Sequence, residues 1–111
     1  MHLLSLLLLA CGRDPDPCVE MCAAAAPLQA ACLEAGGLEW ASTTYEDEQD
    51  YVERCETWAW ELRLLERDAG ERGAVDRVCD EREAALAAAL ENPEAPDCDV
   101  LAGIDWGEMP W

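Results

Sequence analysis

Seven cysteines in a chain of 111 residues are the side chains best suited to chemistry. At this density thiols form disulfides in an oxidising compartment, hold zinc or an iron–sulfur cluster, or act in redox exchange. Cys18 and Cys22 do not have the Cys-x-x-Cys spacing of redox sites, and no second close pair completes a metal site. Structural disulfides are therefore the expected use, with redox activity and metal binding as alternatives. An even set of six is available for them: Cys18, Cys22, Cys32, Cys55, Cys79 and Cys98.

Groups that catalyse proton transfer or nucleophilic attack are scarce in the rest of the chain. The only histidine is His2, and the few hydroxyl groups after the first eleven residues have only carboxylates to act as bases. The acidic run at 46–50 lacks the glycine and the terminal glutamate of an EF-hand loop, so we interpret it as the start of a helix. We expect no enzymatic activity and no cofactor, with weak binding of divalent cations as an alternative.

The charge of the chain excludes one class of partner. Twenty-five acidic residues face seven basic residues, all of them arginine, and the formal net charge is −18. A nucleic acid is a polyanion and is repelled by this charge. Because the length allows one domain at most, we expect a single small domain that does not bind nucleic acid.

The apolar run between residues 3 and 10 indicates where the protein is sent. A span of the bilayer needs about 20 apolar residues, so this run is too short to cross, and its length is that of a secretory signal peptide. It ends in Leu8-Leu9-Ala10-Cys11, which resembles the lipobox of bacterial lipoproteins. The resemblance implies that residues 1–10 are a signal peptide, that the Cys11 sulfur receives a diacylglycerol, and that Cys11 begins the mature chain. A plain secretory leader and the first turns of a buried helix are the alternatives.

The same resemblance implies a location. Acylated Cys11 makes the lipid bilayer a partner and places the protein in the envelope of a Gram-negative bacterium. Because Gly12 is not an inner-membrane retention signal, we expect the outer membrane, with the domain facing the periplasm or the surface. Residues 11–17 form a short tether, in which two prolines and two aspartates keep the chain extended over roughly 20 Å.

Helices are expected after the tether, because alanine and leucine are abundant and β-branched residues are scarce. The first helix starts with Asp16 as its N-cap and Pro17 as its first residue. It runs to about residue 35, where two glycines end it, and Pro27 is expected to kink or split it.

Two further helices and a tail complete the domain. The second helix starts at the capping-box residues 43–46, and the third covers about 74–91. The tail at 99–111 is expected to be irregular, with one turn near 100–104. Helical spacing defines a buried stripe on the second helix, formed by Tyr51, Cys55, Trp58, Leu62 and Leu65.

These elements predict an all-α fold, a small disulfide-stabilised three-helix up-down-up bundle with an irregular C-terminal tail. The Cys-rich helical domain covers residues 18–98. Cysteine heights along the helices, at about 1.5 Å per residue, favour one set of pairs and leave a second open. The favoured set is Cys22–Cys79, Cys32–Cys55 and Cys18–Cys98, and its last pair needs the tail to fold back along the bundle. The alternative set is Cys18–Cys79, Cys22–Cys55 and Cys32–Cys98.

Tryptophans are the candidate binding residues. Trp60 and Leu64 lie one helical turn apart and off the buried stripe, so they either pack under the tail or form an exposed patch for a partner. Trp106 and Trp111 in the tail either dock on the bundle, over Trp60, or act as a recognition element. We expect a membrane-anchored, non-catalytic acidic lipoprotein that binds an envelope protein or another envelope component. A purely structural surface lipoprotein and a weak binder of divalent cations are the alternatives.

Overall fold

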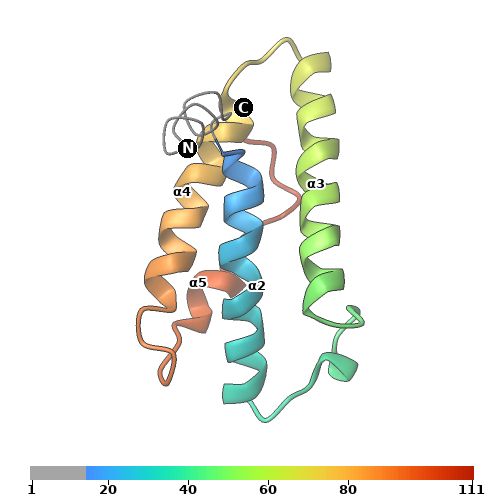
Figure 1. The fold of residues 1–111 in the computed structure, drawn as a ribbon. Helices are drawn as coiled ribbons and strands as arrows, with labels where there is room; N and C mark the ends of the chain where they lie inside the picture. Colours follow the sequence, from blue (N-terminus) through green and yellow to red (C-terminus); the bar gives the residue numbers. More distant parts are fainter. Residues whose placement is uncertain (1–14) are drawn as a thin grey trace, which may run out of the picture.

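The computed structural model of the protein describes residues 15–111. Helices and turns account for its regular structure, and these 97 residues contain no strand, so the all-α prediction is confirmed. The residues with the lipobox resemblance, Leu8 to Cys11, lie outside the described part. Figure 1 shows α2 (Pro17–Ala35), the 3-10 turn η1 (Trp40–Ser42), α3 (Glu48–Asp68), α4 (Ala74–Ala89) and α5 (Cys98–Ala102).

Helix α2 has the ends that the sequence predicts. The Asp16 carboxylate accepts a hydrogen bond of 2.8 Å from the backbone N–H of Cys18, Pro17 is the first helical residue, and Gly36 caps the other end. Pro27 lies inside a helix that continues through it, so the predicted split is wrong. Proline removes one backbone donor, and the contacts of α2 on several sides hold the helix together despite that loss.

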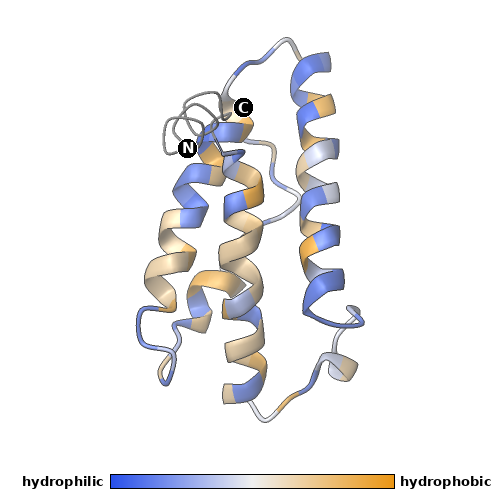
Figure 2. Cartoon of the chain, viewed as in Figure 1, coloured by the Kyte–Doolittle hydropathy of each residue, from blue (hydrophilic) through white to orange (hydrophobic). Residues whose placement is uncertain are grey.

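Helix α2 is the core of the domain, because it contacts α3, α4 and α5, and α4 most extensively. Seven of its side chains are buried, and in Figure 2 apolar residues dominate its middle while α3 is mostly hydrophilic. By length and mean hydropathy (1.2), α2 is the one helix in the described part that could cross a membrane. Its three cysteines are bonded to α3, α4 and α5, which is the environment of a core helix.

Helix α3 begins later than expected. Its N-cap is Asp47, whose carboxylate accepts a hydrogen bond of 2.7 Å from the N–H of Asp50. The capping box predicted at Thr43 is therefore wrong. The Thr43 hydroxyl instead donates to the carbonyl of Trp40 (2.7 Å) and accepts from the N–H of Tyr45 (3.0 Å), which fixes the loop before the helix.

The cysteines pair as in the alternative set, and the favoured set is not the one that the structure contains. The Cα–Cα distances are 4.9 Å for Cys18–Cys79, 5.7 Å for Cys22–Cys55 and 5.8 Å for Cys32–Cys98. The favoured set assumed that the first and third helices begin at one level. In Figure 1, α3 and α4 both extend past the start of α2, which moves Cys79 level with Cys18.

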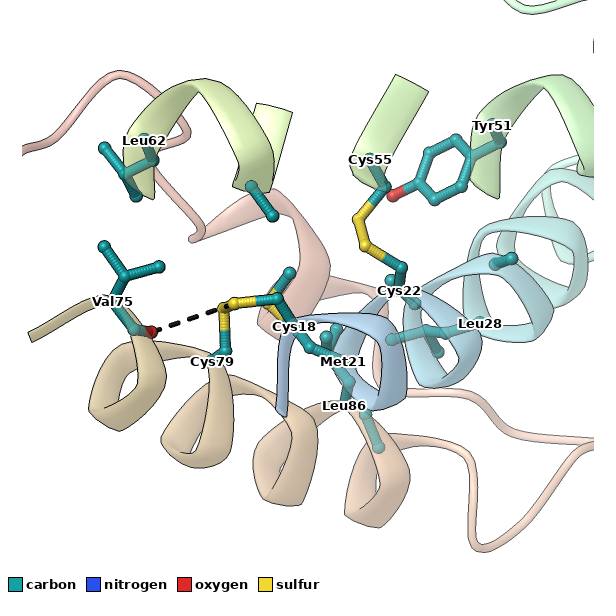
Figure 3. Packing of buried hydrophobic residues seen from close by; sticks show 14 residues of the cluster. Cys18, Met21, Cys22, Leu28, Tyr51, Cys55, Leu62, Val75, Cys79 and Leu86 are labelled. Carbon is teal, nitrogen blue, oxygen red and sulfur yellow. Dashed lines mark hydrogen bonds between the residues drawn. A yellow bond between two sulfur atoms is a disulfide. The ribbon is translucent and has the colours of Figure 1, made fainter. Parts of the chain in front are cut away.

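Apolar side chains pack around two of these disulfides. Figure 3 shows Cys18–Cys79 and Cys22–Cys55 crossing between the helices, next to Met21, Leu28 and Leu86, which are completely buried. One residue of the predicted stripe is misplaced, because Leu65 is 44% exposed. Since the apolar core is this small, disulfides contribute a large part of its stability, about 2–4 kcal/mol each.

Candidate functional site

The Trp60 side chain is the most exposed large apolar group in the described part of the chain. It is 62% exposed on α3, and Val19 on α2 is 45% exposed. Both residues and Ala59 line a shallow hollow of about 190 Å³, with Glu56 and Arg63 also at its surface. Leu64, which was predicted to share an exposed patch with Trp60, is half-buried. The exposed apolar neighbour of Trp60 is instead Val19. We call Val19, Ala59 and Trp60 the Trp60 surface.

An arginine bridge fixes the backbone next to the Trp60 surface. Arg63 on α3 makes two contacts of 2.7 Å, one with an Asp16 carboxylate oxygen before α2 and one with an Asp76 carboxylate oxygen on α4. Burial lowers the pKa of Arg63, but its hydrogen bonds and proximity to Asp76 and Asp16 outweigh this and leave the pKa above its usual value. The bridge therefore ties the start of α2, where the tether joins the domain, to both neighbouring helices.

The same two carboxylates and the Cys18 sulfur lie within 4.8 Å of one another, the spacing of metal ligands. Two observations argue against a cation there. The Cys18 sulfur is bonded to Cys79, so it offers no thiolate. The Arg63 guanidinium already contacts both carboxylates, one through each terminal nitrogen, and so takes the place that a cation between them would occupy. The cluster is best explained as an ion-pair network.

Aromatic side chains form a second feature, which the sequence did not reveal. The rings of Tyr45 and Tyr51 lie 4.8 Å apart, and those of Trp58 and Trp106 lie 4.9 Å apart, both pairs edge to face. With Arg54 and Cys55 they line a cleft of about 210 Å³. Tyr51, Cys55 and Trp58 belonged to the predicted stripe, but nothing local showed that the loop and the tail would complete it.

The electrostatics of this cleft are unusual for so acidic a chain. The Arg82 guanidinium lies 5.5 Å from the ring centres of both Trp58 and Trp106, and the Arg54 guanidinium lies 5.2 Å from that of Tyr45. Burial lowers the pKa of Arg82, although Glu108 and Asp105 oppose this effect. Burial, and secondarily Tyr45, raise the pKa of Tyr51 to about 12. The cleft thus offers aromatic faces and cations, which suit packing and stacking.

The four predicted binding residues are not brought together. Trp106 docks on Trp58 rather than over Trp60, and the indole N–H of Trp58 donates a hydrogen bond of 2.7 Å to the carbonyl of Trp106. Trp111 is 39% exposed, and the preceding carbonyl of Pro110 lies 3.5 Å from the Arg77 guanidinium at the start of α4. Trp60 is more exposed than Trp111, and Leu64, one helical turn further along α3, is half-buried.

No family model, curated protein or solved structure matches the chain.

Proposed function

We propose that this chain is a lipid-anchored, non-catalytic protein of the bacterial cell envelope that binds an envelope component through the Trp60 surface. The observation that carries the proposal is the 62% exposure of Trp60 on a helix tied to the core by the Cys22–Cys55 disulfide. A large indole held in water by a rigid helix costs hydrophobic free energy. Contact with a partner recovers that free energy.

The anchor is the second part of the proposal. The lipobox resemblance at residues 8–11 supports acylation of Cys11, with the outer membrane as the location. An acidic domain gains nothing from anionic lipids, so the acyl chains must provide the membrane affinity. Three buried or half-buried disulfides are consistent with an oxidising compartment such as the periplasm.

The scaffold that presents the surface is the third part. We propose that α2, α3 and α4 form an up-down-up bundle. In its support, α2 and α4 start at the end of the domain where α3 finishes (Figure 1), and the Cys18–Cys79 disulfide joins early turns of α2 and α4. Such a bundle holds Trp60 and Val19 at fixed positions on neighbouring helices.

A structural lipoprotein without a specific partner is the second candidate. The docked tail favours it, because Trp106 is used to close the domain and is not free to recognise a ligand. The third candidate, a weak binder of divalent cations, has the acidic run at 46–50 in its favour, of which residues 46–49 are exposed. A calcium-dependent rise in Tm would support that candidate, and an unchanged Tm would oppose it.

The mass of the intact protein extracted from membranes tests the anchor and the disulfides together. The expected chain begins at Cys11, carries acyl groups, and gains about six daltons on reduction of three disulfides. A chain that begins at Met1 with free thiols would contradict both. Chemical cross-linking in cells then tests binding, with Trp60→Ala expected to lower the yield of a cross-linked adduct. Leu38→Ala is the matched control, because Leu38 is also exposed (53%) but lies far from the Trp60 surface, in the loop after α2.

A further inference from the structure

Exposed apolar side chains gather at one end of the domain. We call it the tether end, because α2 begins there at Pro17, the last residue of the tether. It comprises the start of α2, the end of α3, the start of α4 and the C-terminal residues (Figure 1). The Trp60 surface adjoins it through Val19 in the first turn of α2 and the Arg63 bridge. Of the six large apolar side chains exposed in the described residues, five lie at or next to this end: Val19, Trp60, Leu65, Met109 and Trp111.

The charged residues are also distributed unevenly between the two ends of the domain. The segment 63–77, which includes the end of α3 and the start of α4, carries four arginines and four acidic residues and is therefore neutral. The opposite end consists of the loops around 36–47 and 90–97 (Figure 1). The segments 34–50 and 91–99 at that end contain ten acidic residues and no arginine. The start of α2 and the C-terminal residues add Asp16, Glu20 and Glu108 to the tether end, which remains much less acidic than the opposite end.

We propose that the edge of the domain where the Trp60 surface meets the tether end rests on the lipid bilayer, with Trp60 and Val19 seated at the level of the headgroups. The inference rests on the proposed anchor at Cys11 and names the bilayer surface as the envelope component that the Trp60 surface contacts. Tryptophan is enriched at membrane interfaces, because its ring is apolar and its N–H remains hydrated. Arginine extends its charge toward the headgroups while its stem lies along apolar surface. The acidic end points away from the membrane, where anionic headgroups cannot repel it.

The length of the tether favours the bilayer over a soluble protein partner. From Cys11 to Asp16 the chain spans about 17 Å at most, at about 3.3 Å per residue. Asp16 is held in place by Arg63, whose side chain also lines the hollow beside Trp60. The Trp60 surface is therefore confined to a narrow layer above the lipid, which leaves little room for a folded protein beneath it.

Photo-cross-linking in vesicles tests the proposal on the full lipidated chain. The photoreactive residue p-benzoylphenylalanine replaces Trp60, or Val19 in a second variant, and replaces Leu38 as the matched control at the acidic end. All three native side chains are exposed, so the replacements leave the core intact. Each protein is reconstituted into vesicles of phosphatidylcholine and phosphatidylethanolamine and irradiated, and the adducts are identified by mass. The expected yield of phospholipid adduct is several-fold higher at positions 60 and 19 than at position 38.

Other results have separate meanings. Equal phospholipid yields at all three positions, or none at positions 60 and 19, would overturn the membrane face. An adduct with a protein at position 60 in intact cells, without phospholipid adduct, would overturn it in favour of a protein partner. The same mass spectra report whether Cys11 is acylated. If the chain is acylated but gives no phospholipid adduct, the membrane face is wrong and the proposed anchor stands. If the chain is not acylated but still gives phospholipid adducts at position 60, the proposed anchor is wrong and the membrane face stands.

Discussion

The indole N–H of Trp58 donates a hydrogen bond of 2.7 Å to the backbone carbonyl of Trp106, and the two rings meet edge to face at 4.9 Å. The contact joins residues 48 positions apart and attaches the tail to α3. Arg82 on α4 stacks near both rings and donates to the Asp105 carbonyl at 3.3 Å, so α4 holds the same stretch of tail. Edge-to-face aromatic pairs add about 0.5–1.5 kcal/mol beyond the area that they bury. The tail is therefore part of the folded domain.

Trp106→Ala should lower the free energy of unfolding by about 1–3 kcal/mol, less than a fully buried tryptophan because Trp106 is half-buried. It removes the ring contact with Trp58 and the stacking with Arg82. Trp111→Ala is the control and should change the same quantity by less than about 0.5 kcal/mol. Guanidinium unfolding of the oxidised protein measures both. Equal losses for the two variants would show that the tail is not held through Trp106.

Removal of each disulfide should affect a different part of the domain. Replacing both members of Cys22–Cys55 by alanine removes the covalent link between α3 and the central helix and should cost about 2–4 kcal/mol. Replacing both members of Cys32–Cys98 frees α5 and should raise amide exchange mainly in residues 96–106, with α2 and α4 still joined by Cys18–Cys79. Peptide mapping of the unreduced protein gives the pairing directly. After cleavage at Glu20, which separates Cys18 from Cys22, a linked peptide that contains Cys22 and Cys79 would contradict the structure.

Helix ends that are set by neighbouring residues could be predicted from the sequence. Asp16 and Pro17 define the start of α2, because capping needs only neighbouring residues. The start of α3 could not be predicted in this way, since Thr43 and Asp47 are both residue types that cap helices well. The choice is made by packing at a distance. Trp40 and Tyr45 pack on Tyr51, which draws residues 40–45 into a loop against the helix.

The pairing of the cysteines and the composition of the site depend on how the helices slide along one another. Helical spacing accounts for the direction of the cysteines, because those of α2, α3 and α4 all face a shared core. Their relative heights depend on loop conformation and side-chain packing, which the sequence does not specify locally. The position of Trp60 off the buried stripe left packing under the tail and exposure both open, and the structure shows exposure. The exposure of Val19 next to it follows only from how α2 and α3 meet.

Glu66 should act as the missing cap of α4. The N-cap position is Gly73, which has φ 78° and no side chain, and the buried carboxylate of Glu66 accepts a hydrogen bond of 3.2 Å from the N–H of Ala74. Glu66→Ala should cost about 1 kcal/mol and speed amide exchange at Ala74. Glu66→Gln keeps an acceptor oxygen and should recover most of the loss. If both variants lose the same free energy, the hydrogen bond is not the cause. Glu61→Ala, an exposed change on the same helix, is the control.

Tyr51 should make the stability of the domain fall at alkaline pH. Burial, and secondarily Tyr45, raise its pKa from 10.0 to about 12 in the folded state. As the pH rises above 10.0, the unfolded chain releases the phenol proton first, so it binds fewer protons than the folded chain and gains stability relative to it. The stabilising contribution is complete below pH 10.0 and is lost as the pH rises through about 12.

Unfolding by guanidinium at several pH values should show this decline in the wild type and much less of it in Tyr51→Phe, which keeps the ring. Tyr45→Phe should reduce the decline without removing it, because burial is the larger cause. A decline of the same size in Tyr51→Phe would assign the pH dependence to other groups.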